Sequence, residues 1–345
     1  MHKAREFLLK GKAVDETVNI DLSAIEDALH KGCHPLAGRD LLRLLDLTPD
    51  EFELVIDTAA AQKESWANGG TNPQCPGAAV AIIMEKPSLR TRTSFEVGVA
   101  RMGAHPVVMA DDHSAFSRGE TIQDTTLVLE RFVDAIVLRT FEQAKLEEVA
   151  EWASIPVVNA LSDDFHPCQG LADALTIREH KGKLQGLKLA YVGDGANNMS
   201  HTYLELGALA GMDVRIGAPK NYQPYEWVVQ DCKDIAQETG ATFEFFDNAQ
   251  DAVAGADVVI TDTWTSMGDE EEHDARLKEF DGFQVNSELM SLAAEDAIFL
   301  HCLPAHRGEE VTDEVIDSQQ SVIYDEAENR LHAQKALLSL LMGVA

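Results

Sequence analysis

The sequence has little positive charge. Lys and Arg account for 28 of its 345 residues against 59 Asp and Glu, which gives a formal net charge of −31 at pH 7. Such a surface would repel nucleic-acid phosphates, and this argues against generic nucleic-acid binding. An acidic surface is found on ordinary soluble proteins and also on proteins of a salty cytoplasm. An ordinary soluble protein is the simpler interpretation. An anionic substrate would need a site that concentrates positive charge locally.

Cysteine is also scarce, because its five copies are scattered and never show CxxC spacing. This pattern argues against a disulfide framework or a zinc knuckle and favours a reducing compartment. No apolar run approaches the roughly 18 residues that are needed to cross a bilayer. The N-terminal apolar stretch is too short for a signal peptide. We therefore expect a cytoplasmic protein with neither membrane nor nucleic acid as a partner.

Short apolar, β-branched runs alternate with helical patterns along most of the chain, as in parallel βαβ units. The expected strands are 79–83, 106–109, 135–138, 155–158, 187–192, 214–216, 243–246, 258–260 and 297–300, followed by a strand-like run at 321–324. Helical spacing relates Phe95, Val99 and Met102, and also Leu127 and Arg131 beside Phe132. A chain of this length accommodates about two domains.

These runs predict an α/β fold of two domains, each with a central, mostly parallel sheet flanked by helices. Interdomain helices would join them, and residues 170–177 are the expected hinge. An amphipathic helix is expected at 327–341. Residues 1–36 lack clear periodicity, so the pattern gives them no role.

The first segment whose residues could bind a ligand is 85–96, which follows an expected strand and begins a helix. Helix starts offer unpaired N–H groups and a positive dipole end, and both suit phosphate. Ser88 and Thr91 add hydroxyl groups, and Arg90 can form fork-shaped bonds with phosphate oxygens. A capped helix with solvated arginines would show the same pattern. Taken alone, the segment favours a phosphate site only modestly.

Two further segments follow strands, at the position where open α/β sheets bind ligands. Arg139 closes the run 135–138, and His166 and Gln169 follow the next strand. A neutral histidine can donate to a carbonyl oxygen, and a glutamine can bond an amide group. A surface arginine and a core histidine held by the backbone fit these positions equally well.

In the second half, Gly193 and Gly195 have the GxG spacing of a dinucleotide fingerprint. Asn198 replaces the third glycine and no acidic residue ends the following strand, so a NAD site and a dehydrogenase are disfavoured. Asn198 suits either a zwitterionic ligand or turn formation. Asp262 follows the run 258–260 and suits either an ammonium group or a turn cap.

His301 and Cys302 follow the last clear strand of this half. Neighbours on a strand point to opposite faces, so a Cys–His dyad is disfavoured and a buried cysteine is the simpler interpretation. The first half thus offers phosphate binders, while the second offers an acid, amides and a cysteine suited to an amino acid. This partition predicts a transferase that joins two small substrates across a cleft.

Five segments, in order, resemble the successive signatures of ornithine carbamoyltransferases within the aspartate/ornithine carbamoyltransferase family. They are Ser88-Leu89-Arg90-Thr91-Arg92, His166-Pro167-Cys168-Gln169, Asp262-Thr263-Trp264-Thr265-Ser266-Met267-Gly268, His301-Cys302-Leu303-Pro304 and Glu328-Asn329-Arg330. The resemblance extends from about Leu36 to the end of the sequence. It implies transfer of the carbamoyl group of carbamoyl phosphate to the δ-amine of L-ornithine, giving L-citrulline and phosphate, in arginine metabolism. It also implies no metal or cofactor, and a homotrimer or a multiple of trimers with active sites at subunit boundaries.

The resemblance also implies roles for single residues. Carbamoyl phosphate would be bound by Ser88, Leu89, Arg90, Thr91, Arg139, His166, Gln169, Cys302, Leu303 and Arg330. Ornithine would be bound by Asn198, Asp262, Ser266 and Met267, and the catalytic group would be Arg139, His166, Cys302 and Arg330. Residues 37–170 would form the carbamoyl phosphate-binding domain, with a helix at 325–345 packing back on it. Residues 171–324 would form the ornithine-binding domain, and residues 1–36 would be an extension.

Two positions depart from the family pattern. Leu89 stands where the family usually has threonine, a change that is tolerated if the backbone N–H binds the phosphate. Ala115 stands where the family has a glutamine that reaches carbamoyl phosphate in the neighbouring subunit. Either Ser114, Ser117 or Arg118 replaces it, or the affinity for carbamoyl phosphate is reduced.

Two alternatives to ornithine transfer follow from these departures. The chain could be a carbamoyltransferase with another amine acceptor such as putrescine, or a non-catalytic ligand-binding relative. The segment Ser266-Met267-Gly268 favours ornithine over aspartate and putrescine, because in the family it contacts the amino-acid end of the substrate.

Overall fold

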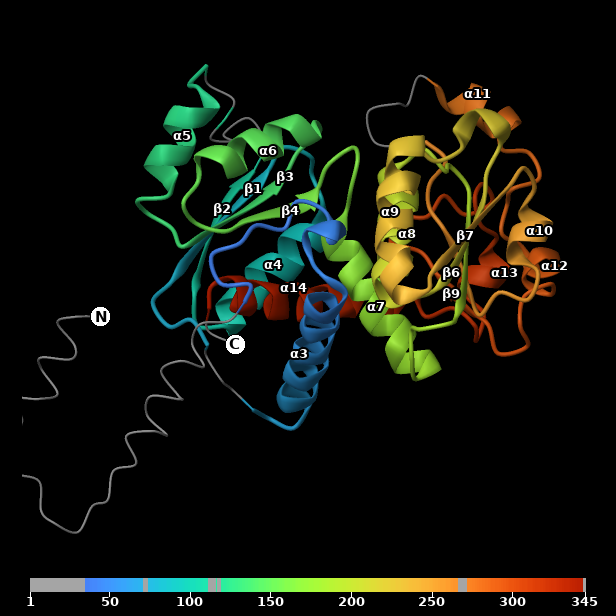
Figure 1. Cartoon of the computed structure of the whole chain (residues 1–345), viewed down its shortest axis with the longest axis horizontal. Coiled ribbons are helices and arrows are strands. Elements are labelled where there is room, and N and C mark those ends of the chain that lie inside the picture. The colour runs from blue at the N-terminus through green and yellow to red at the C-terminus, as the bar shows by residue number, and fades with distance from the viewer. Residues whose placement is uncertain (1–34, 71–73, 111–115, 117–118, 266–271, 344–345) are drawn as a thin grey trace, which may run out of the picture.

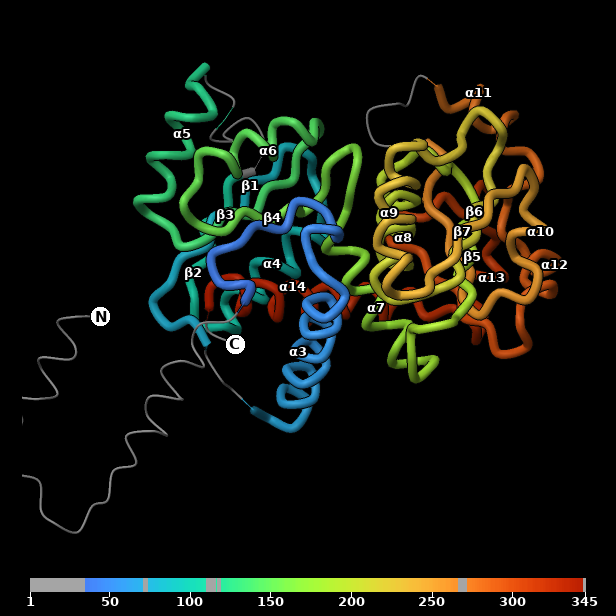
Figure 2. Tube along the Cα trace, in the orientation of Figure 1, coloured from blue at the N-terminus to red at the C-terminus, as the bar shows by residue number. Residues whose placement is uncertain are grey.

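The computed structural model describes residues 35–70, 74–110, 116, 119–265 and 272–343. Within them the chain forms two α/β halves, drawn mainly blue to green and mainly yellow to red in Figure 1. Helices flank a central sheet in each half, and the same arrangement can be followed along the trace in Figure 2. The predicted fold class, two α/β domains with parallel sheets, is confirmed. No helix of the described residues is long and apolar enough to cross a bilayer.

The first sheet contains four parallel strands in the order β2-β1-β3-β4. They are β1 (Ala79–Met84), β2 (His105–Ala110), β3 (Ala135–Arg139) and β4 (Val157–Leu161). Its helices are α3 (Pro49–Ala67), α4 (Leu89–Arg101), α5 (Ile122–Leu129) and α6 (Gln143–Trp152), after a short 3₁₀ turn η1 (Leu44–Asp46). Strand β3 is buried at every position, as expected for a parallel strand covered on both faces.

The second sheet contains five parallel strands in the order β7-β6-β5-β8-β9. They are β5 (Lys188–Val192), β6 (Asp213–Gly217), β7 (Thr242–Phe246), β8 (Val258–Thr261) and β9 (Ile298–Leu300). The helical elements of this half are α8 (Asn198–Ala210), η3 (Lys220–Tyr222), α9 (Glu226–Thr239), α10 (Ala249–Val253), α11 (His273–Glu279), α12 (Ser287–Met290) and α13 (Asp313–Ile316).

Two long helices, α7 (Pro167–Lys181) and α14 (Ile323–Leu341), lie against each other where the halves meet. Helix α14 also packs on α3 and α4. Helix α7 is buried from Pro167 to Ile177 and ends at Gly182, whose φ of 76° suits glycine. A Cβ on Gly170 would lie 2.7 Å from Thr202 Cγ2, so glycine lets α7 approach α8 closely.

In three places the structure differs from the sequence expectation by more than one residue. Residues 321–324 do not form a strand, because Ser321 makes only an isolated bridge with Phe299 and α14 begins at Ile323. Acidic residues in the first turn of α14 favour the helix and outweigh the β-branched run. Helix α5 ends at Leu129, so Arg131 and Phe132 lie beyond it. Strand β4 begins at Val157, the residue after Pro156, and extends to Leu161.

Candidate active site

A cleft of ≈1240 Å³ lies between the two sheets. In each sheet the strand order reverses, between β1 and β3 and between β5 and β8, and such switch points create a crevice at the strand carboxyl ends. The predicted site residues that line the cleft are Ser88, Leu89, Arg90, Thr91, Arg139, His166, Gln169, Asn198, Asp262, Cys302, Leu303 and Arg330. The predicted ornithine ligands Ser266 and Met267 lie outside the described residues, as do Ser114, Ala115, Ser117 and Arg118.

The start of α4 brings hydroxyl and guanidinium groups together. Ser88 caps the helix, since its Oγ accepts a 3.3 Å hydrogen bond from the N–H of Thr91. Thr91 Oγ1 in turn lies 3.4 Å from Arg139 Nη1 and 3.3 Å from Arg330 Nη2. The Leu89 side chain is 79% exposed, so only its backbone is held at the helix start. This local geometry accommodates a leucine side chain at the helix start.

Three arginines converge here, and none of them has a carboxylate partner among the described residues. Arg139 and Arg330 are 8% and 2% exposed. Within the described part of the chain, the side-chain hydrogen bonds of Arg90, Arg139 and Arg330 go to the Leu303 carbonyl, Thr91 and Gln169. Burial, reinforced by the charges of Arg330 and Arg90, lowers the pKa of Arg139 to about 10. Such a concentration of buried positive charge favours binding of an anion.

His166 stands beside these arginines as a neutral imidazole. It precedes α7, where its backbone N–H donates to Thr202 Oγ1 over 2.9 Å. Burial lowers the pKa of His166 well below its usual value, and the charges of Arg330, Arg139 and Arg90 lower it further. Its Nδ1 is buried and has no hydrogen-bond partner among the described residues. The ring can therefore donate one N–H to a carbonyl oxygen of a ligand.

The opposite wall of the cleft carries a carboxylate. Asp262 follows β8, and its Oδ1 accepts hydrogen bonds from Cys302 Sγ at 3.2 Å and from the N–H of Thr263 at 2.8 Å. Burial raises the pKa of the Cys302 thiol well above its usual value, and the charge of Asp262 raises it further. Cys302 is therefore a protonated hydrogen-bond donor, and it is not a thiolate nucleophile.

Both ring nitrogens of His301 have partners other than the Cys302 thiol. Its Nε2 lies 3.1 Å from Glu310 Oε1, and its Nδ1 accepts a 2.9 Å bond from the N–H of Leu303. The hydrogen bonds of His301 to Glu310 and Leu303, and of Cys302 to Asp262, disfavour a catalytic dyad, although the two side chains lie closer together than the strand argument predicts. Leu303 has a φ of 58°, and its carbonyl accepts a hydrogen bond from Arg90 Nη2.

Asn198 is the first residue of α8. Its Nδ2 donates to the Ser162 carbonyl over 2.6 Å, which fixes the orientation of its amide. The carbonyl oxygen is then the group that Asn198 can offer to an N–H of a ligand. Asp262 and Asn198 together give this wall acceptors, whereas the opposite wall is rich in donors.

Two groups of described side chains have potential metal-ligand atoms within 4.8 Å of one another. They are Asp262, His301 and Cys302, and His306, Glu309 and Glu310. Cysteine binds metals as a thiolate, so the protonated Cys302 is better explained by its hydrogen bond to Asp262. In the second group, Glu310 Oε1 accepts a 2.6 Å bond from the N–H of His306.

Sequence patterns did not indicate several charged residues of the cleft. Lys86 is 6% exposed, with its Nζ 2.5 Å from Asp163 Oδ1 and 4.1 Å from the centroid of the Phe141 ring. Arg276 Nη1 lies 2.6 Å from Asp194 Oδ2. Lys86 lies two positions before Ser88, so its place in the sequence could have indicated that it lines the cleft. Arg276 follows no strand, so no pattern marked it.

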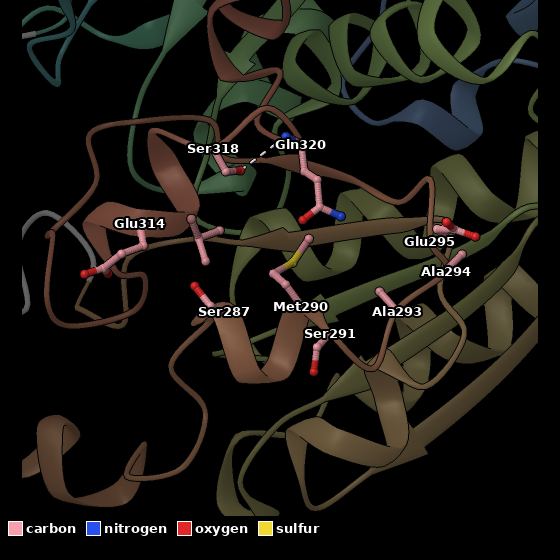
Figure 3. Close-up of a pocket in the computed structure, with 10 residues that line it drawn as sticks. Ser287, Met290, Ser291, Ala293, Ala294, Glu295, Glu314, Ser318 and Gln320 are labelled. Carbon is pink, nitrogen blue, oxygen red and sulfur yellow. Dashed lines mark hydrogen bonds between the residues drawn. The ribbon is translucent and has the colours of Figure 1, made fainter.

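A smaller pocket of ≈250 Å³ lies in the second half between α12 and α13 (Figure 3). It is lined by Ser287, Met290, Ser291, Ala293, Ala294, Glu295, Glu314, Val315, Ser318 and Gln320. It contains two glutamates, no basic residue and no motif residue, so its chemistry does not suit a phosphate.

Most of the chain matches a known family. The carbamoyl-P binding domain of aspartate/ornithine carbamoyltransferases matches residues 39–179, and the Asp/Orn binding domain matches residues 185–341. The chain therefore belongs to the aspartate/ornithine carbamoyltransferase family, and the resemblance inferred from the five segments is confirmed.

Individual relatives are similar over nearly their full length. The ornithine carbamoyltransferase of Anoxybacillus flavithermus is 52% identical over 307 residues, which cover 89% of this chain and 98% of the relative. That of Clavibacter sepedonicus is 54% identical over 305 residues, covering 88% and 98%. The solved ornithine carbamoyltransferase from Pyrococcus furiosus superposes with a TM-score of 0.87 at 48% identity, covering 90% of this chain and 99% of that chain.

Proposed function

We propose that the protein transfers the carbamoyl group of carbamoyl phosphate to the δ-amine of L-ornithine, giving L-citrulline and phosphate. The observation that carries this proposal is the convergence of Arg90, Arg139 and Arg330 beside the neutral His166, in a chain whose net charge is −31. Such a site suits a phosphate joined to a carbonyl group. The names of relatives at 48–54% identity support ornithine as the acceptor.

The wall of the cleft that carries the start of α4, Arg139 and His166 binds and polarises carbamoyl phosphate. Ser88, Arg90 and Thr91 hold the phosphate, while Arg139 and His166 donate to the carbonyl oxygen, where negative charge develops. The δ-amine attacks the carbonyl carbon, a C–N bond forms, and the intermediate loses a proton as the C–O bond to phosphate breaks. Carbamoyl phosphate already carries a good leaving group, so positioning and charge stabilisation supply the catalysis.

The opposite wall, which carries Asp262 and Asn198, holds ornithine, the acceptor of the carbamoyl group. Asp262 pairs with the α-ammonium group of ornithine, and the Cys302 thiol keeps that carboxylate in place through its 3.2 Å hydrogen bond. Asn198, with Ser266 and Met267, completes the contacts to the amino-acid end. A free amine of this type has a pKa of about 10. The nearby arginines favour its neutral, reactive form, because they disfavour another cation.

The proposal also includes the roles of the two domains, the oligomeric state, the location in the cell and the metabolic role. Carbamoyl phosphate is bound mainly by residues 37–170 and ornithine mainly by residues 171–324. We expect a cytoplasmic homotrimer acting in arginine metabolism. Val128 and Phe132 are 53% and 74% exposed near the end of α5, and contact with a second copy would remove this apolar surface from water.

A comparison of acceptors tests the proposed function. The purified protein is expected to form citrulline from carbamoyl phosphate and ornithine, with kcat/KM at least about 10³-fold above that for putrescine or aspartate. Putrescine lacks the α-carboxylate, and aspartate lacks the distal amine. Faster carbamoylation of putrescine would establish a different acceptor. Binding of carbamoyl phosphate without carbamoylation of any of the three would indicate a non-catalytic relative.

Replacing Asp262 with asparagine is expected to weaken ornithine binding much more than carbamoyl phosphate binding. The lost interaction is charge-assisted and corresponds to about 1.5–3 kcal/mol. Calorimetry with each ligand measures both effects. Asp274→Asn is the matched control, because it removes the same charge from an exposed position of α11 outside the cleft lining. A larger loss for carbamoyl phosphate would show that the two walls have been assigned the wrong way round.

A further inference from the structure

Two buried carboxyl groups lie beneath the cleft without lining it. Asp173 on α7 is 0% exposed, and Glu326 on α14 is 1% exposed. Both accept hydrogen bonds from Gln169 Nε2, at 2.7 Å to Asp173 Oδ1 and 3.0 Å to Glu326 Oε1. The mechanism above uses neither carboxyl group. Burying two acids side by side is unfavourable, so their position calls for a physical reason.

These contacts fix the orientation of the Gln169 amide. Its Oε1 accepts a 2.6 Å hydrogen bond from Arg330 Nη1, on the side opposite the two carboxyl groups. A guanidinium group only donates and an ionised carboxylate only accepts. A flipped amide would place its oxygen against carboxyl oxygens and its NH₂ against the guanidinium. One orientation therefore satisfies all the contacts, and Gln169 presents its oxygen to the arginine side of the cleft.

The two carboxyl groups are themselves held from other elements. Asp173 Oδ2 accepts a 3.0 Å hydrogen bond from the Tyr203 hydroxyl of α8, and Glu326 Oε2 accepts a 2.8 Å bond from the N–H of His301 after β9. Burial raises the pKa of both carboxyl groups, and the charge of Asp173 raises that of Glu326 further.

We propose that Asp173 and Glu326 are positioning residues that hold the Gln169 oxygen toward the cleft, where it accepts a hydrogen bond from the –NH₂ of the carbamoyl group. This inference rests on the proposed function, because it takes carbamoyl phosphate as the ligand. A carbonyl oxygen has two lone pairs, so Gln169 Oε1 can accept from Arg330 and from the ligand together. The pair would thus help the site to distinguish a carbamoyl group from an acyl group that has no N–H.

Three variants separate orientation from simple packing. Asp173→Asn is the matched control, since its Oδ1 still accepts from Gln169 and its NH₂ can donate to the Tyr203 oxygen. Asp173→Leu removes the acceptor. Glu326→Gln keeps the volume, but its NH₂ must face either the N–H of His301 or the NH₂ of Gln169. Glu326→Gln therefore disturbs the Gln169 amide, and it provides the test if the Asp173→Leu protein does not fold.

The readout is the affinity for carbamoyl phosphate relative to acetyl phosphate, which carries a methyl group in place of the –NH₂. Calorimetry on the full-length, folded proteins gives both constants. Wild type and Asp173→Asn are expected to prefer carbamoyl phosphate by about three- to tenfold, as one neutral hydrogen bond allows. In Glu326→Gln and Asp173→Leu this preference is expected to fall to about one. A purely structural role would weaken both ligands equally.

An unchanged preference in Glu326→Gln and in any folded Asp173→Leu protein would overturn the inference. So would a wild-type protein that makes citrulline without preferring carbamoyl over acetyl phosphate. Failure of the proposed function has a different result, in which the wild-type protein makes no citrulline at all.

Discussion

Replacing Arg139 with methionine is expected to lower kcat/KM for carbamoyl phosphate by about 10²- to 10³-fold, the loss typical of a removed oxyanion donor. Arg139 ends β3, is buried, and lies with Arg330 against Thr91. Methionine retains much of the apolar volume of the side chain. The variant also removes a cation whose pKa is lowered to about 10 by burial and by neighbouring arginines. Folding stability should therefore stay unchanged or increase.

Steady-state kinetics and thermal unfolding of the same preparations test this separation of activity from stability. Lys233→Met serves as the control, because Lys233 is an exposed residue of α9 that belongs neither to the cleft lining nor to the Val128 and Phe132 surface. The control should change neither quantity. A stability loss in Arg139→Met large enough to account for the missing activity would make Arg139 a structural residue.

Most of the fold was predictable because buried parallel strands appear in the sequence as continuous apolar runs. The run at 258–260, for example, became the buried strand β8. The run at 321–324 was misassigned, since local sequence does not reveal that Ile323 is buried at the start of a helix. The acidic first turn of α14 favours the helix, and the tertiary packing of α14 completes the choice between the two conformations at that position.

The cleft residues were predictable for a topological reason. Arg139 and Asp262 each stand at or just after the carboxyl end of a strand, and parallel strands place those ends at one edge of a sheet. Asp173 and Glu326, whose carboxyl groups contact Gln169, do not follow a strand and had no such signal in the sequence. Gln169 and Glu326 are 157 positions apart, so nothing near Glu326 in the sequence indicates what it contacts. The roles of Ser266 and Met267 stay predictions.

A second large effect is expected where the two halves of the protein are joined. Arg43, just before η1, places its Nε 2.5 Å from Glu205 Oε1 on α8 and its Nη1 2.8 Å from Asp231 Oδ2 on α9. Its guanidinium also lies 4.6 Å from the centroid of the Phe165 ring. Glu205 is 0% exposed, and its Oε2 accepts a 2.8 Å bond from the N–H of Leu44. Arg43 is thus the charged partner of a fully buried carboxylate.

At pH values above the folded pKa of Glu205, about 7, Arg43→Met is expected to lower the free energy of unfolding by about 3–5 kcal/mol, because it leaves Glu205 buried without a cation. Burial already raises the pKa of Glu205 to about 7, against the opposing effect of Arg43, and without Arg43 it should rise further. A raised carboxyl pKa contributes stability that is present at low pH and is lost as pH rises through the folded value.

The deficit of Arg43→Met relative to wild type should consequently be small near pH 5, where Glu205 is protonated in both folded proteins. It should grow as pH rises through about 7, where the wild-type Glu205 ionises beside Arg43. Denaturant unfolding across this range measures the deficit. In the double variant Arg43→Met/Glu205→Gln, the amide oxygen can still accept from the N–H of Leu44, and the pH-dependent part should disappear. A deficit that is equal at every pH, or that persists unchanged in the double variant, would mean that Arg43 stabilises the junction by packing on Phe165 and would remove the buried ion pair as the cause.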